Sequence, residues 1–189
     1  MNLPNRLTVS RVLLTAVFVV VLSIAIPYHY TLALVIFLIA ALTDYADGVI
    51  ARKHNLITDF GKLMDPLADK ILTASAFICL VSFGAFPAWV TIVIVSREFL
   101  ITGLRLLASS KGIILPAEKL GKHKTAWQMI TIVYFLLLLT AKEWSGASGS
   151  ALQAAWTVGG PILVAVTVFL TAYSGLAYFW KNRRLLESM

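Results

Sequence analysis

The chain has 189 residues, of which 59% are hydrophobic and only 13% are charged, and its mean hydropathy is +0.86. This composition excludes an ordinary soluble domain and is typical of a protein whose helices cross a membrane. The net charge of +7 favours contact with anionic lipid headgroups. Nucleic acid is not an expected partner, because the chain has no soluble region that could carry a basic binding face.

Six apolar runs are candidates for membrane spans, since a helix needs about 17 to 25 apolar residues to cross the hydrocarbon core. In chain order they cover Val12–Pro27, Tyr30–Ile50, Leu67–Phe83, Pro87–Leu107, Thr125–Thr140 and Ala155–Trp180. A secretory signal is an alternative for the first run, but no clear cleavage site and no polar mature chain follow it. We therefore predict an all-α integral membrane protein. It forms a single domain of residues 1–189, with six transmembrane helices and a short N-terminal interfacial segment, MNLPNRLT.

Basic residues predict the orientation of these spans, because cytoplasmic loops carry an excess of Lys and Arg. Only Lys142 falls in a loop on the opposite side. The residues on the basic side are Arg6, Arg11, Arg52, Lys53, Lys62, Arg105, Lys111, Lys119, Lys122, Lys124, Lys181, Arg183 and Arg184. We therefore expect a multi-pass protein of the cell membrane with both termini in the cytoplasm.

All five aspartates lie in one stretch, residues 44–70, which reads DYADGVIARKHNLITDFGKLMDPLADK. Asp44 and Asp47 are three positions apart at the end of the second span. Asp65 and Asp69 are four positions apart where the third begins, so each pair shares one helix face. The loop between these spans is predicted to be cytoplasmic. We therefore expect Asp44 and Asp69 to lie about 10 Å below the cytoplasmic edge of the membrane core. Asp47 and Asp65 would lie one turn nearer the water, so that the four carboxylates can converge.

Four carboxylates this close together repel one another unless cations compensate them. Hard oxygen ligands select Mg²⁺, Mn²⁺ or Ca²⁺, and a two-metal centre could hold a diphosphate and position an attacking hydroxyl. Alternatively, the aspartates only pair with nearby cations, as in a solvated loop. Those cations are Arg52, Lys53, Lys62 and Lys70. We favour the metal centre, because loop charges need not occupy two helical stripes.

Eight residues of this stretch follow the pattern D-x-x-D-G-x-x-A-R-x(8)-G-x-x-x-D-x-x-x-D without a departure. They are Asp44, Asp47, Gly48, Ala51, Arg52, Gly61, Asp65 and Asp69. The pattern resembles the signature of the CDP-alcohol phosphatidyltransferase family. The resemblance implies a metal-dependent membrane enzyme, commonly a homodimer, that moves a phosphatidyl group from a CDP-linked lipid to an alcohol and releases CMP.

The same resemblance implies roles for the motif residues. Two Mg²⁺ or Mn²⁺ ions would be held by Asp44, Asp47, Asp65 and Asp69. Asp69 would also be the catalytic base. CDP-diacylglycerol would be received by Arg52 and by the small surfaces of Gly48, Ala51 and Gly61.

Three further segments resemble the branch of this family that uses sn-glycerol 3-phosphate. They are N-L-P-N-x-L-T-x-x-R at the start of the chain, R-E-x(6)-R from residue 97, and L-G-K-x-K-T-A-x-Q-M from residue 120. Their cations would suit a phosphorylated alcohol. We predict that the acceptor phosphate is bound by Arg97, Arg105, Lys122 and Lys124.

Simpler interpretations of these cations exist, since Arg97 is as well explained by a structural ion pair and Lys122 and Lys124 by a basic rim. Two other functions also remain open. A related synthase that uses serine or inositol would share the aspartates. A divalent-cation transporter also places acidic residues in membrane helices, but it leaves the G-x-x-A-R spacing unexplained.

Overall fold

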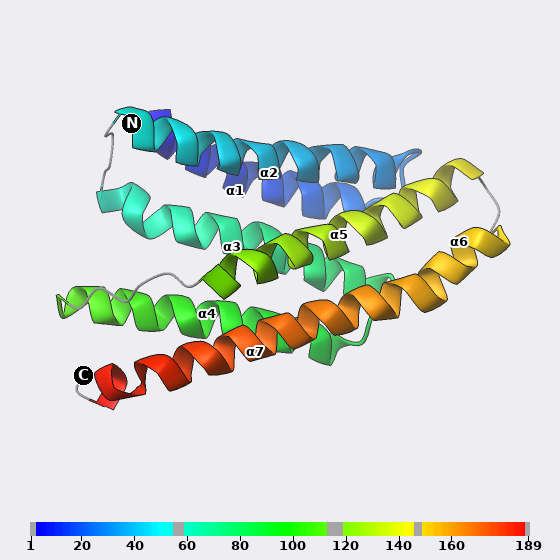
Figure 1. Cartoon of the computed structure of the whole chain (residues 1–189). Helices are drawn as coiled ribbons and strands as arrows, with labels where there is room; N and C mark the ends of the chain where they lie inside the picture. The colour runs from blue at the N-terminus through cyan, green and yellow to red at the C-terminus, as the bar shows by residue number, and fades with distance from the viewer. Residues whose placement is uncertain (1–2, 55–58, 113–118, 146–148, 188–189) are drawn as a thin grey trace.

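The computed structural model describes residues 3–54, 59–112, 119–145 and 149–187, and these form a bundle of long helices without a strand in the described ranges (Figure 1). Most of each predicted span lies within a helical stretch, although the first span was predicted to reach Pro27 and its helix ends at Ser23. The elements are α1 (Leu3–Ser23), α2 (His29–His54), α3 (Asp59–Ser82), α4 (Ala88–Ser110), α5 (Lys119–Ser145), α6 (Ser150–Ala154), the π-helix η1 (Ala155–Gly159) and α7 (Gly160–Glu187).

The helices are longer than the apolar runs that predicted them. In particular, α1 begins at Leu3, so most of MNLPNRLT belongs to the first helix and is not a separate segment. α3 begins eight residues before the predicted third span, which places Gly61 and Asp65 inside the helix. Hydropathy alone underestimates the length of these helices, because polar residues can continue a helix beyond the apolar core.

A tight turn at Gly84 ends α3. Gly84 has φ +71° after α3. Its amide donates to the carbonyl of Val81 at 3.0 Å, and the amide of Ala85 donates to that of Leu80 at 3.1 Å. This is the Schellman pattern, in which a left-handed residue satisfies the last carbonyls of a helix. Pro87 then precedes α4 in an extended conformation.

Aromatic rings fill the interior of the bundle. Phe86 lies 5.7 Å from Phe77 and 5.6 Å from Phe135, measured between ring centroids, so α3, α5 and the residues before α4 meet at one core. Phe18 of α1 and Phe37 of α2 make a similar contact at 5.6 Å. Among the described residues, α1 packs against both α2 and α3, and α5 packs against α2, α3 and α7.

The outer surface carries many exposed apolar side chains, whereas the interior holds polar groups. Leu13, Ile92 and Leu176 are 62%, 62% and 72% exposed, while Thr131 and Thr171 are completely buried. Large exposed apolar surfaces are rare on soluble monomers, so this distribution is consistent with a membrane protein.

Length and composition support the same interpretation. Within the described residues, His123–Trp144 and Ser150–Arg183 are long and apolar enough to cross a membrane. Shorter apolar helical stretches cover Thr8–Ser23, His29–Thr43 and Lys70–Ser82. α4 carries three charged residues, Arg97, Glu98 and Arg105. Hydropathy therefore identifies α4 less readily than its neighbours.

A π-helical turn interrupts the last long helix directly before Pro161. Because proline has no amide hydrogen, the regular pattern of carbonyl bonding cannot continue through this position. The Tyr134 hydroxyl of α5 donates to the carbonyl of Ala155 at 2.8 Å. Gly159 leaves room for this contact, because a Cβ there would lie 2.3 Å from the Tyr134 hydroxyl oxygen.

We expect Gly159→Ala to destabilise the protein by about 1 to 3 kcal/mol, because the added methyl group forces Tyr134 away from the π-turn. Thermal unfolding in detergent measures the change. Gly103→Ala in α4 is the matched control: its Cβ would meet no atom within 4 Å, so stability should stay equal or rise. Tyr134→Phe combined with Gly159→Ala should recover part of the loss. If Gly159→Ala is as stable as wild type, the steric explanation is wrong.

Candidate functional site

The eight motif residues lie on the backbones of two helices, with Asp44–Arg52 in α2 and Gly61–Asp69 in α3. Their side chains lie outside the part of the chain whose side chains the structure describes. This applies to Asp44, Asp47, Gly48, Ala51, Arg52, Gly61, Asp65 and Asp69. Because both segments are helical, Asp44 and Asp47, three residues apart, share one face of α2. Asp65 and Asp69, four residues apart, share one face of α3.

Aromatic contacts at the far end of the bundle fix the relative height of α2 and α3. Tyr30, near the start of α2, meets Phe83, at the end of α3, edge to face with 5.4 Å between ring centroids. Asp44 follows Tyr30 by fourteen residues, and Asp69 precedes Phe83 by fourteen. At about 1.5 Å per residue, both aspartate backbones lie about 21 Å from this contact. The two halves of the motif therefore lie at one level.

A buried arginine lies on the helix that packs against both halves of the motif. Arg11 of α1 is only 1% exposed and has polar or charged interactions, and α1 packs against α2 and α3. Twelve residues separate Arg11 from Ser23 at the end of α1, or about 18 Å. The sequence identified Arg11 as a marker of orientation and as the last residue of the N-terminal segment N-L-P-N-x-L-T-x-x-R, whereas the structure places its side chain inside the bundle.

A polar network joins α4, α5 and α7 in the same region of the bundle. Its centre is the buried carboxylate of Glu98, which forms ion pairs with Lys124 of α5 and with Arg97 at 3.2 Å. Gln128 donates to Glu98 at 3.4 Å and to the Thr171 hydroxyl at 3.3 Å. Buried charges are stable only when they are paired and hydrogen-bonded in this way.

The network lies at about the height of the motif. Gln128 precedes Lys142 by fourteen residues, and Lys142 lines the same pocket as Tyr30 and Phe83. The distance along α5 is again about 21 Å. α5 packs against α2 and α3, so the network and the two motif segments belong to one polar layer of the bundle.

Close approach of α7 helps to position Arg97. A Cβ at Gly175 would lie 3.0 Å from Cγ of Arg97, so the arginine stem passes directly over this glycine. Arg97 therefore has a structural ion pair with Glu98 and a defined path for its side chain.

Arg105 lies two turns beyond Glu98 on α4 and contacts a different residue. Its guanidinium lies 5.2 Å from the ring centroid of Tyr178 on α7, and its Nε donates to the Tyr178 hydroxyl at 3.3 Å. Tyr178 is 1% exposed, and its carbonyl accepts from the side chain of Asn182 at 2.8 Å. Arg105 thus has a fixed position, about 10 Å along the helix from the network.

Of the four cations predicted to bind the acceptor phosphate, the structure brings Arg97 and Lys124 together through Glu98 and places Arg105 nearer the rim. The side chain of Lys122 lies outside the described part. α5 begins at Lys119, so Lys124 is five residues inside the helix and not at its first turn. The predicted span from Thr125 left Lys124 just outside the helix, whereas polar residues extend α5 towards its N-terminus.

Sequence analysis missed Glu98 as the partner of two cations, and it missed Gln128, Thr171 and Tyr178. A signal for the network was present, because a carboxylate inside an apolar span must find a cation. The partners themselves could not be chosen without the packing of α4, α5 and α7. Among the residues whose side chains the structure describes, no group of three or more His, Cys, Asp or Glu could hold a metal, and the four motif aspartates are not among these residues.

Comparison with known proteins assigns the family. Residues 1–173 match the sequence model of the CDP-alcohol phosphatidyltransferases. A Bacillus subtilis (strain 168) protein named CDP-diacylglycerol–glycerol-3-phosphate 3-phosphatidyltransferase is 40% identical, over 99% of this chain and 98% of its own length. A Rickettsia bellii protein of the same name is 35% identical, over 94% and 93%. A probable phosphatidylglycerophosphate synthase of Mycobacterium tuberculosis is 36% identical, over 94% and 79%. The chain therefore belongs to the CDP-alcohol phosphatidyltransferase family.

Proposed function

We propose that this protein transfers the phosphatidyl group of CDP-diacylglycerol to sn-glycerol 3-phosphate, giving phosphatidylglycerophosphate and CMP. The observation that carries the proposal is the single polar layer, in which both halves of the motif lie level with a cluster of buried cations. The names of relatives that match almost the whole chain support the same donor and acceptor.

We place the protein in the cell membrane with six spans and with both termini and the motif facing the cytoplasm. Figure 1 supports this topology, because both termini and the ends of α2 and α4 lie at one end of the bundle. Tyr28, Trp89 and Trp144 are exposed at the opposite end, where aromatic side chains suit the membrane interface. We also propose that the chain acts as a homodimer.

The donor set of the motif fits the divalent metal that this family generally uses. Four aspartates on two level helices offer only hard oxygen ligands, which suit Mg²⁺ or Mn²⁺. Asp44, Asp47, Asp65 and Asp69 would hold a two-metal site. When bound, the metal would neutralise charge on the diphosphate and on the departing phosphate.

The protein's own residues then perform the remaining steps. Arg52, beside Gly48, Ala51 and Gly61, binds the cytidine nucleotide while the acyl chains extend into lipid. Asp69 accepts the proton of the acceptor's primary hydroxyl. The resulting oxygen attacks the phosphorus bonded to diacylglycerol, the bond from that phosphorus to the CMP oxygen breaks, and CMP leaves.

We assign binding of the acceptor phosphate to Arg97, Arg105, Lys122 and Lys124. Glu98 limits the charge that Arg97 and Lys124 can offer, so the more peripheral Arg105 becomes the principal contact. Its stacking on Tyr178 orients the planar guanidinium, which can bind phosphate through two hydrogen bonds.

We expect Arg105→Ala to lower kcat/KM for glycerol 3-phosphate by about ten- to a hundredfold, because one charge-assisted contact contributes about 1.5 to 3 kcal/mol. The KM for CDP-diacylglycerol should change little. Tyr178→Phe is the matched control: it keeps the ring under Arg105 and removes one hydrogen bond, so its loss should be only a few-fold. An unchanged KM for glycerol 3-phosphate in Arg105→Ala would remove Arg105 from the acceptor site.

Supplying one acceptor at a time tests the function itself. Purified protein receives CDP-diacylglycerol with glycerol 3-phosphate, serine or inositol, and mass spectrometry identifies the lipid product. We expect phosphatidylglycerophosphate with the first acceptor alone. A product formed only with serine or inositol would keep the family chemistry and overturn the choice of acceptor.

A further inference from the structure

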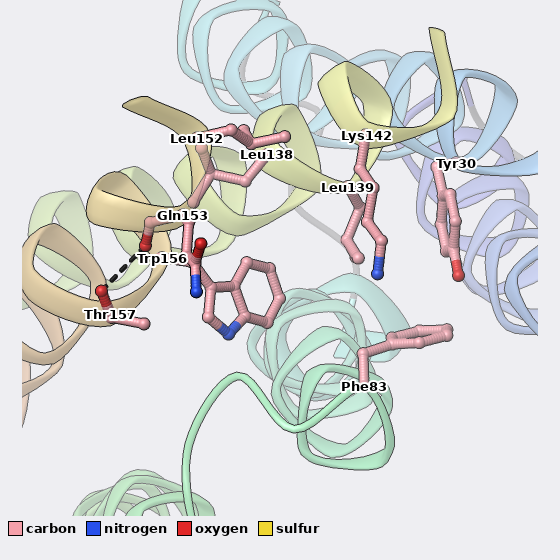
Figure 2. A pocket seen from close by; sticks show the side chains of 9 residues that line it. All are labelled: Tyr30, Phe83, Leu138, Leu139, Lys142, Leu152, Gln153, Trp156 and Thr157. Carbon is pink, nitrogen blue, oxygen red and sulfur yellow. Dashed lines mark hydrogen bonds between the residues drawn. The ribbon is translucent and has the colours of Figure 1, made fainter. Parts of the chain in front are cut away.

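A pocket of about 400 Å³, whose lining side chains are drawn in Figure 2, lies at the end of the bundle opposite the motif. Its walls come from the start of α2, the end of α3, the end of α5, and α6 with η1. The proposed reaction uses none of these residues. The lining combines aromatic rings and leucines with one cation, Lys142.

Hydrogen bonds and ring contacts hold the aromatic walls in place. The amide of Tyr30 donates to the Glu143 carboxylate at 3.1 Å, and Thr31 donates to it through its amide at 3.0 Å and its hydroxyl at 2.7 Å. Glu143 therefore binds the start of α2 and fixes Tyr30 against Phe83. The facing wall, Trp156, lies on the π-turn and meets Phe135 edge to face at 5.3 Å.

The π-turn is what presents Trp156 to the pocket. It lies in a helix that Pro161 disrupts, and Tyr134 and Gly159 together accommodate it. Such turns occur frequently at functional sites, because they redirect a side chain that a regular helix would point elsewhere. The pocket is thus built by several specific contacts.

The only charge that lines the described pocket is positive. Figure 2 shows the Lys142 amine pointing into the pocket, between Trp156 on one side and Tyr30 on the other. No carboxylate lines the pocket within the described residues. The neighbouring Glu143 is already engaged by α2 and lies 3.4 Å from His29. The Lys142 amine is therefore available for an anionic ligand.

Exposed aromatic residues place the pocket at the level of lipid headgroups. The rings of Tyr28 and Trp144 contact each other with 5.4 Å between their centroids, and both side chains are more than half exposed. Trp and Tyr concentrate at the boundary between hydrocarbon and water. A ligand here would meet water at one end and hydrocarbon at the other.

We propose that this pocket binds an anionic phospholipid, with Lys142 contacting the headgroup phosphate and Trp156 and Leu139 contacting the glycerol and the first carbons of the chains. The pocket's size suits a headgroup and glycerol, with the acyl chains lying outside along the bundle. The proposal rests on the membrane placement proposed above. It does not depend on the transfer reaction, because the pocket lies at the other end of the bundle.

The test measures lipid retained by the purified full-length protein. Detergent-solubilised protein is mixed with phosphatidylglycerol or phosphatidylcholine, and native mass spectrometry gives the bound fraction. We expect tighter binding of phosphatidylglycerol, and a roughly fivefold weakening in Lys142→Gln, from about 1 kcal/mol for a lysine near a membrane surface. Lys111→Gln, an exposed lysine at the end of α4, is the matched control and should bind as wild type does.

A second pair of variants tests the aromatic wall. Trp156→Ala should weaken binding of phosphatidylglycerol, whereas Trp144→Ala, on the outer surface, should not. Equal binding by wild type and Lys142→Gln, or an equal loss in Lys111→Gln, would overturn the proposal. Equal affinity of the wild-type protein for phosphatidylglycerol and phosphatidylcholine would also overturn it.

Free glycerol phosphate distinguishes the lipid from a soluble phosphate. It should fail to displace phosphatidylglycerol from the pocket, because it lacks the apolar part that Trp156 and Leu139 contact. Displacement at concentrations comparable to the lipid would overturn the lipid assignment. CMP release is measured on the same samples. A pocket variant that loses lipid binding while releasing CMP normally separates this proposal from the transfer reaction.

Discussion

Asp65→Asn should reduce transfer on the order of a thousandfold or more while leaving the helical fold intact. Asparagine has nearly the same size as aspartate but lacks the negative charge that a metal ligand supplies. Stabilisation of the transferred phosphate by metal contributes several kcal/mol, and about 4 kcal/mol corresponds to a thousandfold in rate. CMP release from CDP-diacylglycerol with glycerol 3-phosphate measures the loss.

Asp59→Asn is the matched control for this prediction. Asp59 is the first residue of α3 and the one aspartate of the stretch that the motif does not include. The control loses the same charge in the same helix, and we expect it to retain most of the activity. Circular dichroism confirms that both variants remain helical. Near-normal turnover by Asp65→Asn at ordinary metal concentration would contradict the metal assignment.

The sequence predicted the positions of the long helices because apolar length directly reflects the thickness of the membrane core. It could not predict their neighbours. The described residues show α1 packed against both α2 and α3, an arrangement that no spacing within a single span predicts. Spacing along one helix determines a shared face, but the choice of partner helix depends on side-chain shape over the whole bundle.

In the candidate site, too, spacing along one helix was predictable from the sequence, whereas contacts between helices were not. Fixed spacing identified the aspartates from sequence, and the backbone places both segments at one level. The pairing of Lys124 with Glu98 depends on side chains that come from two different helices, α5 and α4, and no local pattern encodes it. The π-turn at Ala155–Gly159 was also unpredicted, although Pro161 marked the place where a regular helix would be disturbed.

The largest effect on stability is expected for Glu98→Gln. Glu98 is the carboxylate of a network that holds two cations, and Lys124 is only 5% exposed. Glutamine preserves the shape but removes the charge, so Lys124 loses its ion pair with Glu98. Breaking one side of a buried ion pair costs about 3 to 5 kcal/mol, a large share of the roughly 5 to 15 kcal/mol that stabilises a typical domain.

Thermal unfolding in detergent should therefore show Glu98→Gln well below the wild type. The decisive comparison is the double variant Glu98→Gln, Lys124→Gln, which removes both charges of this pair. It should recover most of the lost stability, because the cost arises from breaking the ion pair on one side and not from the missing hydrogen bond. Gln128→Leu supplies the uncharged comparison: it breaks the hydrogen bonds to Glu98 and Thr171 but leaves the ion pair, so its loss should be smaller, about 1 to 3 kcal/mol. If the double variant is less stable than Glu98→Gln alone, Lys124 is held by other contacts and Glu98 is not the anion that keeps it inside the bundle.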